Sequence, residues 1–413
     1  MKILYLHQYF NTPAMASSTR SYEMARRLVD YGHEVHMVSS YREQGQIDRK
    51  GWFESEEAGI KVHWLPVPYS NMMSYRERVV SFLKFASRAA IKAASIECDV
   101  IYATSTPLTI ALPAIYAARK HKVPMVFEVR DLWPELPIAI GAIKNPLLIM
   151  AAKELERFAY RNASFVVALS PGIKEGIIRA GFPAEKIIVI PNSCDLELFQ
   201  TGSKKDTLIR AQYDWLQDRP LVLYAGTIGR INGVEYLARL AGVIERIDQD
   251  VRFLVIGSGF GEKKLREEAK KLGVLDKNFF ILPRVPKRNI PEWLAAADIA
   301  TSLFIDLEEM WSNSANKLFD ALAAGKPVAI NYGGWQSHIL EESGAGIVLN
   351  PKDIESSAET LVEKIKDNNW LSSAGHAARE LAESSFDRNI LALEINKVLL
   401  DSVESYKPKH GKY

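Results

Sequence analysis

The sequence predicts an α/β protein of two doubly wound domains, each a parallel sheet with helices on both faces. Three observations lead to this fold class. The chain has 413 residues, enough for two to three domains at roughly 150 residues each. Short runs rich in β-branched residues alternate with longer helical patterns. The alternation stops once, in a polar stretch at 201–218, and then restarts, which is typical of two sheets in series.

Seven short apolar runs predict the strands of the first domain. Most are apolar at successive positions, as strands are when helices cover both faces of a sheet. Gly32 and Gly181 stand where two of the intervening helical patterns end. The strands are expected at 2–6, 34–38, 61–65, 99–103, 125–129, 165–169 and 186–190, and the helices at 17–31, 75–96, 107–120, 145–161 and 171–180.

Six further runs predict the second sheet. We expect a first domain at 1–190, a second at 191–385, and a final helix and tail at 386–413 that crosses back onto the first domain, because chain ends commonly lie near each other. Doubly wound sheets bind ligands at the carboxyl ends of their strands, so two of them predict a central cleft with a ligand on each side. The six strands are expected at 221–225, 251–256, 278–282, 298–303, 327–331 and 346–349.

Bulk properties exclude several classes of protein. The net charge of +2 gives no support for a nucleic-acid partner. The two cysteines, Cys98 and Cys194, are far apart, which suits a reducing compartment and argues against structural zinc. The apolar run at 3–6 is too short for a signal peptide, and no run approaches the roughly 20 residues of a membrane span. We expect a cytoplasmic protein, soluble or peripheral on a membrane.

The segment SNSANKLFDALAAGKPV at 312–328 carries the strongest site signal. Ser312 and Ser314 are N-cap residues before a predicted helix that opens at Ala315 and Asn316. A helix opening after a strand presents free backbone N–H groups and the positive end of the helix dipole. The segment therefore predicts a seat for a diphosphate.

Two charged residues follow in the same helix. Lys317 lies in the first turn, where the helix dipole favours an acid, so a cation there is consistent with a bound anion. Asp320 lies three residues on, on the same face, and a carboxylate there can accept two ribose hydroxyls. A capped core helix with a surface Lys–Asp pair fits the sequence equally well.

A second candidate segment is LVLYAGTIGRING at 221–233. Gly226 and Gly229 let the backbone approach a ligand closely, and Arg230 offers a fork for phosphate. An ordinary turn between strand and helix is the alternative. The DxD triplet at 248–250 falls at the amino end of a strand, the wrong end for a ligand, so we predict no metal site.

Taken together, the motifs resemble the family-4 retaining glycosyltransferases, which have the GT-B architecture. The resemblance is closest to the bacterial branch that builds capsule or O-antigen repeat units and includes N-acetylhexosamine and N-acetylfucosamine transferases. The matching segments are LHQYF (6–10), RSYEMARRLVDYGHEV (20–35), VFEVRDLWPE (126–135), ALSPGIKEGI (168–177), IPNSCDLELF (190–199), YAGTIGRING (224–233), IPEWLAAADIA (290–300) and NKLFDALAAGKPV (316–328).

The resemblance implies an activity. A hexose or N-acetylhexosamine would move from a nucleotide diphosphate, UDP by family frequency, to a polyprenyl-diphosphate-linked saccharide, without a metal. The first domain would be the acceptor side and the second would bind the nucleotide sugar. Asp320 would be the second acid of the family's E-x7-E motif, whereas the position of the first acid is Ser312, which leaves the usual donor-sugar contact without its carboxylate.

The positive charge of the donor site also departs from the family pattern. The Arg and Lys that usually follow the first strand of the second domain map to Thr227 and Asn232. We infer that Lys317, with Arg230 or Arg284, supplies the missing charge, because negative charge builds on the diphosphate leaving group in the transition state.

In the first domain, VRDLWPE places Arg130, Asp131 and Glu135 at the carboxyl end of a strand. The resemblance implies that this region meets donor sugar and acceptor, so Arg130 and Asp131, with Lys317, are the catalytic candidates. A strand-end salt bridge followed by a turn at Pro134 is the alternative.

Four further residues are acceptor-side candidates. Arg20 is placed to hold an acceptor phosphate, although a surface arginine at a helix start fits equally. His7 follows the first strand, where a satisfied strand-end histidine is the alternative. Thr104 and Ser105 stand where many relatives carry a donor-contacting histidine, so no side-chain base is assigned.

Two segments are candidates for peripheral contact with the inner membrane. In 75–96, Lys84, Arg88 and Lys92 repeat every four residues along one stripe. The segment 136–150 is unusually apolar, and both suit an anionic leaflet. Helices packed on the sheet are the alternative reading.

Two other functions fit the same architecture. A nucleotide-sugar epimerase or phosphorylase would act on soluble substrates. A two-lobed solute-binding protein is usually exported, and the expected lack of a signal peptide counts against it.

Overall fold

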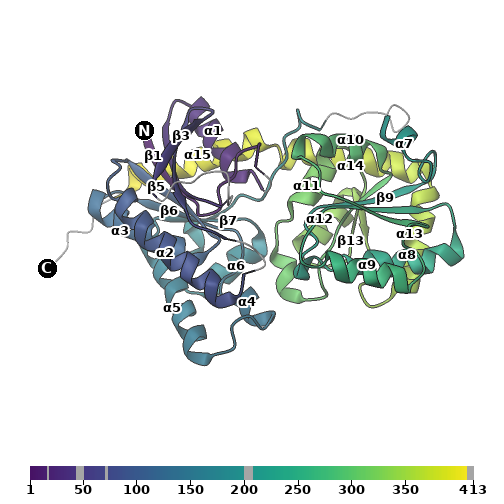
Figure 1. The fold of residues 1–413 in the computed structure, drawn as a ribbon. Coiled ribbons are helices and arrows are strands. Elements are labelled where there is room, and N and C mark those ends of the chain that lie inside the picture. Colours follow the sequence, from purple (N-terminus) through teal and green to yellow (C-terminus); the bar gives the residue numbers. More distant parts are fainter. Residues whose placement is uncertain (16–17, 43–50, 70–72, 200–207, 407–413) are drawn as a thin grey trace. The chain divides into compact units, whose positions relative to one another are not determined.

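The computed structural model describes residues 1–15, 18–42, 51–69, 73–199 and 208–406, and the chain divides into two compact units (Figure 1). Unit 1 comprises Met1–Pro191, Ser312–Ser314 and Asn389–Tyr413. Unit 2 comprises Asn192–Trp311 and Ala315–Arg388. Each unit contains one sheet, in the order β3-β4-β2-β1-β5-β6-β7-β8 in unit 1 and β11-β10-β9-β12-β13-β14 in unit 2. The predicted fold class, two doubly wound α/β domains, is confirmed.

The sheet of unit 1 is parallel except at one edge, where β3 runs antiparallel to β4. Its strands are β1 (Lys2–Leu6), β2 (Glu34–Tyr41), β3 (Phe53–Glu57), β4 (Ile60–Pro66), β5 (Val100–Thr104), β6 (Met125–Val129), β7 (Phe165–Ala168) and β8 (Ile187–Val189). Its helices are α1 (Arg20–Asp30), α2 (Tyr75–Ala93), α3 (Ala111–His121), α4 (Glu135–Ala139), α5 (Pro146–Asn162), α6 (Pro171–Arg179) and α15 (Arg388–Ser405).

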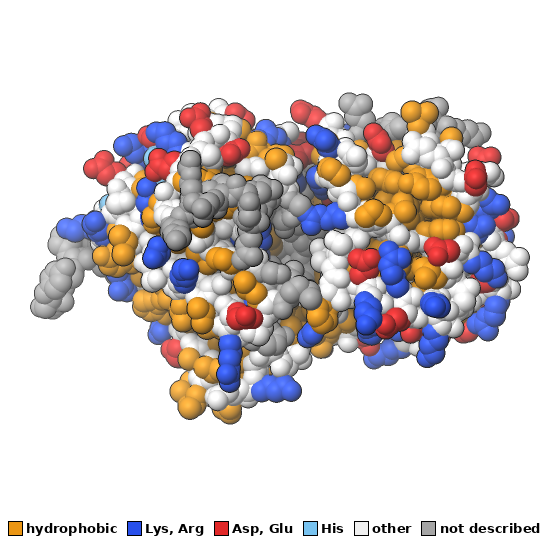
Figure 2. Space-filling model, viewed as in Figure 1, with side chains coloured by type: hydrophobic (Ala, Val, Ile, Leu, Met, Phe, Trp, Pro, Cys, Tyr) orange, Lys and Arg blue, Asp and Glu red, His pale blue; other side chains and the backbone are white. Residues whose placement is uncertain are grey.

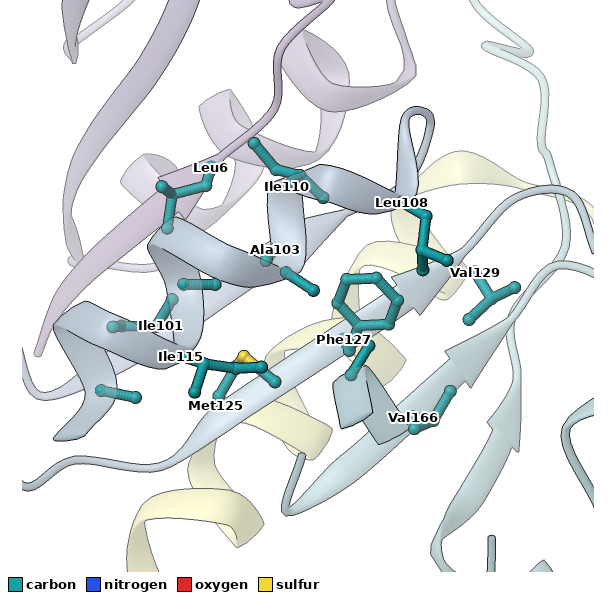
Figure 3. Packing of buried hydrophobic residues seen from close by; sticks show 14 of the residues in the cluster. Leu6, Ile101, Ala103, Leu108, Ile110, Ile115, Met125, Phe127, Val129 and Val166 are labelled. Atoms are coloured by element: carbon teal, nitrogen blue, oxygen red, sulfur yellow. The ribbon is translucent and has the colours of Figure 1, made fainter. Parts of the chain in front are cut away.

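Alternating side chains of the strands build two cores in unit 1. Leu4 and Leu6 of β1 belong to the core on the face covered by α2, α3, α5 and α6. Figure 3 shows Leu6 and its neighbours in this core. Ile3 and Tyr5 point to the opposite face, which is covered by α1 and α15. Both faces carry an apolar core because most of the strands are apolar at successive positions. The predicted return of the last helix onto the first domain is also found, since α15 contributes Leu391, Ile395 and Leu399, among others, to this second core.

The sheet of unit 2 is parallel throughout its described strands. Helices α8, α9 and α13 cover one face, and α10 and α11 pack on β9 and β12 from the other. The strands are β9 (Leu221–Ala225), β10 (Arg252–Ile256), β11 (Phe279–Leu282), β12 (Ile299–Ser302), β13 (Val328–Ile330) and β14 (Gly346–Val348). The helices are α7 (Leu208–Gln212), α8 (Glu235–Ile247), α9 (Glu262–Lys271), α10 (Ile290–Ala296), α11 (Asn316–Ala323), α12 (Trp335–Ser343), α13 (Ile354–Lys366) and α14 (Asn368–Ser385).

The order of the strands locates a binding crevice in each sheet. In unit 2 the chain proceeds from β9 toward β11 on one side and from β12 toward β14 on the other, so the order reverses between β9 and β12. In unit 1 it reverses between β1 and β5. Ligands of open α/β sheets bind at the carboxyl ends of the strands at such a switch point. Among the described residues, none of the helices is long and apolar enough to cross a bilayer.

Candidate active site

The structure brings the two predicted motifs of unit 2 together at its switch point. Gly226 follows β9 directly, and Lys317 is the second residue of α11, which follows β12. A Cβ on Gly226 would lie 2.8 Å from Cδ of Lys317, so the missing side chain makes room for the lysine stem. The Lys317 Nζ lies 5.2 Å from the ring centroid of Tyr224 in β9, a cation–π contact.

The environment of Lys317 is that of a partly desolvated cation. Burial lowers the pKa of Lys317 to about 8, although the nearby Asp320 carboxylate raises it. A small cavity of about 20 Å³, lined by Lys317, Asp320 and Thr301 among others, has room for about one water molecule. A burial-depressed pKa in a crevice is typical of a functional cation, and an anionic ligand would relieve it.

Asp320 has a partner that the sequence analysis missed. Its carboxylate pairs with Nζ of Lys287, which begins a short 3-10 helix, Lys287–Asn289, before α10. Lys287 also lies over the ring of Phe199, 5.2 Å from its centroid. In the sequence, Lys287 is one of two adjacent basic residues after Pro286. So short a segment has no helical or strand periodicity that would have pointed to a site.

The opening of α11 differs in detail from its prediction. The N-cap residue is Ala315, and no side chain caps the helix there, so Ser312 and Ser314 are not the predicted N-caps. Ser312 instead ends a 3-10 helix, Glu308–Ser312, and Ser314 is buried. The helix starts at Asn316, and an end without a side-chain cap leaves backbone N–H groups for other acceptors.

The remaining donor-side candidates have other contacts. The guanidinium of Arg230 lies 4.3 Å from the ring centroid of Phe260. The backbone N–H of Gly229 donates to Oδ1 of Asn232 over 3.1 Å, which makes this a self-contained turn. Arg284 is exposed after β11, two strands from β9, so Lys287 and not Arg284 is the basic residue that pairs with Asp320.

No group of metal-binding side chains is present among the residues with described positions. Within the DxD triplet, Asp248 pairs with Lys366 and accepts a hydrogen bond from the backbone N–H of Asp250 over 2.8 Å. It lies before the amino end of β10. The triplet therefore closes a turn.

In unit 1, a buried carboxylate organises the predicted site residues. Glu128 of β6 is 0% exposed. Its Oε2 accepts hydrogen bonds from Nη2 of Arg20 at 2.8 Å and the Tyr102 hydroxyl at 2.7 Å. Its Oε1 accepts from Oγ1 of Thr104 at 2.6 Å and Nε of Arg130 at 3.1 Å. Burial raises the pKa of Glu128, but Arg20 and Arg130 outweigh it and hold the pKa well below its usual range.

Arg130 is held from several sides at the carboxyl end of β6. Its Nε also donates to Oγ1 of Thr104 over 2.8 Å, and its Nη2 donates to Oγ of Ser21 over 2.5 Å. Its backbone N–H donates to Oγ of Ser105 over 3.0 Å. Thr104 and Ser105, predicted on the acceptor side, therefore contact Arg130.

Arg20 is buried, contrary to the alternative that it is a surface arginine at a helix start. Its side chain is 3% exposed, so it is not a surface arginine. Besides Glu128, it donates to the carbonyl oxygens of Pro191 at 2.7 Å and Ile190 at 3.1 Å. These bonds use most of its N–H groups, which leaves little of the guanidinium for the predicted acceptor phosphate.

The other acceptor-side candidates have distinct environments. Burial raises the pKa of Asp131, whose Oδ2 accepts from Oγ1 of Thr106 over 3.1 Å. Burial lowers the pKa of His7 well below its usual value, and its Nδ1 has no hydrogen-bond partner among the described residues, so it is not the satisfied histidine of the alternative reading. Glu135 begins α4 and pairs with Arg179 at 3.5 Å on the surface.

Comparisons with known proteins match both halves of the chain. The glycosyl transferase 4-like domain matches residues 16–193, and the glycosyl transferases group 1 model matches residues 205–381. A putative colanic acid biosynthesis glycosyl transferase, WcaI of Escherichia coli, is 24% identical over 91% of this chain and 94% of its own length.

Solved structures share the fold at low identity. Sucrose-phosphate synthase from Thermosynechococcus elongatus superposes with a TM-score of 0.80 and 15% identity, covering 98% of this chain and 100% of that one. Anabaena HepE in complex with UDP superposes with a TM-score of 0.73 and 20% identity, covering 97% and 100%. The matches do not support the epimerase or phosphorylase alternative.

Proposed function

The chain belongs to the group 1 glycosyltransferases with a glycosyl transferase 4-like domain, and from this premise we propose its reaction. It is a retaining transferase that moves a hexose or N-acetylhexosamine from a UDP-sugar to a polyprenyl-diphosphate-linked saccharide, without a metal, in cell-surface polysaccharide synthesis. The relative named for colanic acid biosynthesis supports the pathway class. The bound UDP of HepE supports the nucleotide.

The observation that carries the proposal is the cluster of Gly226, Lys317 and Asp320 at the switch point of unit 2. In the proposed complex, the diphosphate lies at the opening of α11 beside the Lys317 ammonium. The Asp320 carboxylate then accepts hydrogen bonds from the ribose hydroxyls, and these replace part of its ion pair with Lys287. Lys287, thus released, would add positive charge to the site as negative charge builds on the leaving diphosphate.

The acceptor side of the proposal lies in unit 1. Arg130 and Asp131 stand at the carboxyl end of β6, near the switch point of that sheet. The Arg130 guanidinium would orient an anionic or hydroxyl group of the substrates. No side chain is assigned as a base, and in the proposed retaining reaction the leaving diphosphate itself takes the acceptor proton.

Calorimetric titration with UDP tests the donor site. UDP should bind the wild-type chain, and Lys317→Ala should lose about tenfold or more in affinity because a charge-assisted contact is removed. Asp320→Ala should weaken UDP more than it weakens inorganic diphosphate, which has no ribose. Lys264→Ala, an exposed lysine on α9 of the same unit, is the matched control. Wild-type affinity in both site variants would refute the proposed site.

A lipid-linked acceptor requires access to a membrane, and we propose that α2 and the start of α5 supply it on the cytoplasmic face. On α2, Val80 is 64% and Ile91 is 74% exposed, beside the exposed Lys84 and Arg88. Figure 2 shows hydrophobic and basic side chains next to each other over the helices of unit 1. Aliphatic side chains among basic ones suit the interface of an anionic leaflet.

The start of α5 is the better defined of the two candidate membrane contacts, because its exposed apolar residues are close together in the sequence. It exposes Leu147 to 69%, Leu148 to 61% and Met150 to 59%. Flotation with vesicles that contain anionic phospholipid should recover the wild-type chain, and Leu147→Glu with Leu148→Glu should reduce the recovered fraction severalfold. Leu393→Glu, an exposed leucine of α15, is the control. Equal recovery of both variants would exclude α5 as a membrane contact.

A further inference from the structure

The carboxylate of Glu128 lies between two arginines and bonds each through a different oxygen. Oε2 faces Arg20 and Oε1 faces Arg130. We infer that Glu128 is a positioning residue for glycosyl transfer: it fixes the guanidinium of Arg130 at the carboxyl edge of the unit 1 sheet. The inference rests on the proposed function, in which Arg130 contacts substrate.

Oε1 of Glu128, which faces Arg130, helps to set the direction of the Arg130 guanidinium. Nε of Arg130 is shared between Oε1 of Glu128 at 3.1 Å and Oγ1 of Thr104 at 2.8 Å. Thr104 in turn donates to Oε1 over 2.6 Å, which closes a triangle of hydrogen bonds. Nη2 is held by Ser21. The nitrogen for which the described residues provide no hydrogen bond is Nη1, so it is the one left to bind a ligand.

The opposite side of the carboxylate keeps Glu128 itself from turning. Arg20 donates to Oε2 from both Nε at 3.1 Å and Nη2 at 2.8 Å. The Tyr102 hydroxyl adds a third bond to this oxygen at 2.7 Å. Arg20 is anchored to the backbone at Ile190 and Pro191, the last residues of unit 1 before the chain enters unit 2. A carboxylate with hydrogen bonds to both of its oxygens is held rigidly and gives its partners a defined orientation.

The negative charge matters as well as the shape. Arg20 is 3% exposed and Arg130 is 15% exposed, so the two guanidiniums share a poorly solvated site. Glu128 supplies the one negative charge that both guanidiniums share. Removing that charge leaves neighbouring buried cations without their common partner, and Arg130, the more exposed of the two, is freer to turn toward water.

The test compares two nearly isosteric changes: one replaces the carboxylate by a neutral amide, and the other removes a single hydrogen bond from it. Glu128→Gln should lower kcat by about tenfold or more, because a small misplacement of a catalytic group has a large effect on rate. The KM for the donor and the affinity for UDP should change less than about twofold, since the nucleotide site is in unit 2. Tyr102→Phe removes one of the three bonds to Oε2 but keeps the carboxylate and its charge, so it should lower kcat much less than Glu128→Gln does, even where it lowers the melting temperature.

A double-mutant cycle shows whether Glu128 acts through Arg130. If it does, Glu128→Gln combined with Arg130→Gln loses no more kcat than Arg130→Gln alone, whereas independent roles multiply. Multiplying losses, or a wild-type kcat in Glu128→Gln, would overturn the inference. If Glu128→Gln does not fold, Thr104→Val removes the bridging hydroxyl from the same triangle and should lower kcat with little effect on UDP affinity. A wild-type chain that transfers no sugar would instead refute the proposed function.

Discussion

At the scale of single residues, Lys317 should link the proposed nucleotide binding to pH. Burial lowers its pKa to about 8 in the free protein, and a bound diphosphate raises the pKa because it stabilises the ammonium. The protonated form therefore binds more tightly. Below about pH 8 this lysine adds no pH dependence, and above it the affinity falls toward about tenfold per pH unit until the pKa of the complex is reached.

Calorimetry with UDP between about pH 7 and about pH 9.5 measures this linkage. Lys317→Arg keeps a positive charge throughout that range, because an arginine does not deprotonate there. It should flatten the curve even if it weakens binding at every pH. A slope in Lys317→Arg equal to that of the wild type would mean that another group is titrating.

Some residues of the candidate site stand in a recognisable local sequence pattern, and others do not. Lys317, Asp320 and Gly226 could be predicted because each stands at a recognisable strand–turn–helix junction. Glu128 could not, because it lies within the apolar strand MVFEV at 125–129 and its partner Arg20 is 108 positions away. A buried acid of this kind has no local pattern, since its partners are brought together only by the sheet.

At the scale of elements, the strands with two buried faces were predicted and the edge strand β3 was not. β3 reads FESEE and is only half buried, and a half-buried edge strand has no continuous apolar run. Edge strands gain from charge because it discourages pairing with other chains. The charged residues of β3 thus prevented its prediction from the sequence, and the same residues suit a strand at the edge of a sheet.

The β3–β4 hairpin should make unit 1 sensitive to acid. His63 of β4 bonds Glu54 of β3 at 2.8 Å and stacks on His36 of β2, with Lys92 also near Glu54. Burial, followed by Lys92, lowers the pKa of His63, so the unfolded chain binds a proton more readily than the folded one. Stability should be lost as pH falls below the unfolded pKa of about 6.5.

Urea unfolding at about pH 7.5 and about pH 5.5 measures that loss. His63→Gln cannot be protonated and should lose less stability on acidification than the wild type. His7, whose pKa is also lowered by burial, should account for part of the remainder. His338→Gln in unit 2 is the control. An acid sensitivity in His63→Gln as large as in the wild type would assign the effect to other groups.

At the scale of the whole molecule, the last helix of the chain forms part of the core of unit 1. α15 (yellow in Figure 1) lies against unit 1, and Leu391, Ile395, Val398 and Leu399 are nearly fully buried in its core. Each such side chain contributes about 1.5–3 kcal/mol on burial. Their sum is comparable to the whole stability of a typical domain, about 5–15 kcal/mol. Unit 1 therefore depends on residues synthesised after unit 2.

Ending the chain after Arg388, the last residue of unit 2, should consequently unfold unit 1 while unit 2 persists. Unit 2 has its own core of β9, β10, α8 and α13 residues, so the shortened chain should keep one cooperative thermal transition. UDP should shift this transition upward if it binds the folded unit 2 as proposed. A chain ending after Tyr406 keeps all of α15 and is the control, expected to unfold like the wild type. Two intact transitions in the shorter chain would show that α15 is dispensable, and loss of the UDP-shifted transition would show that the units do not fold separately.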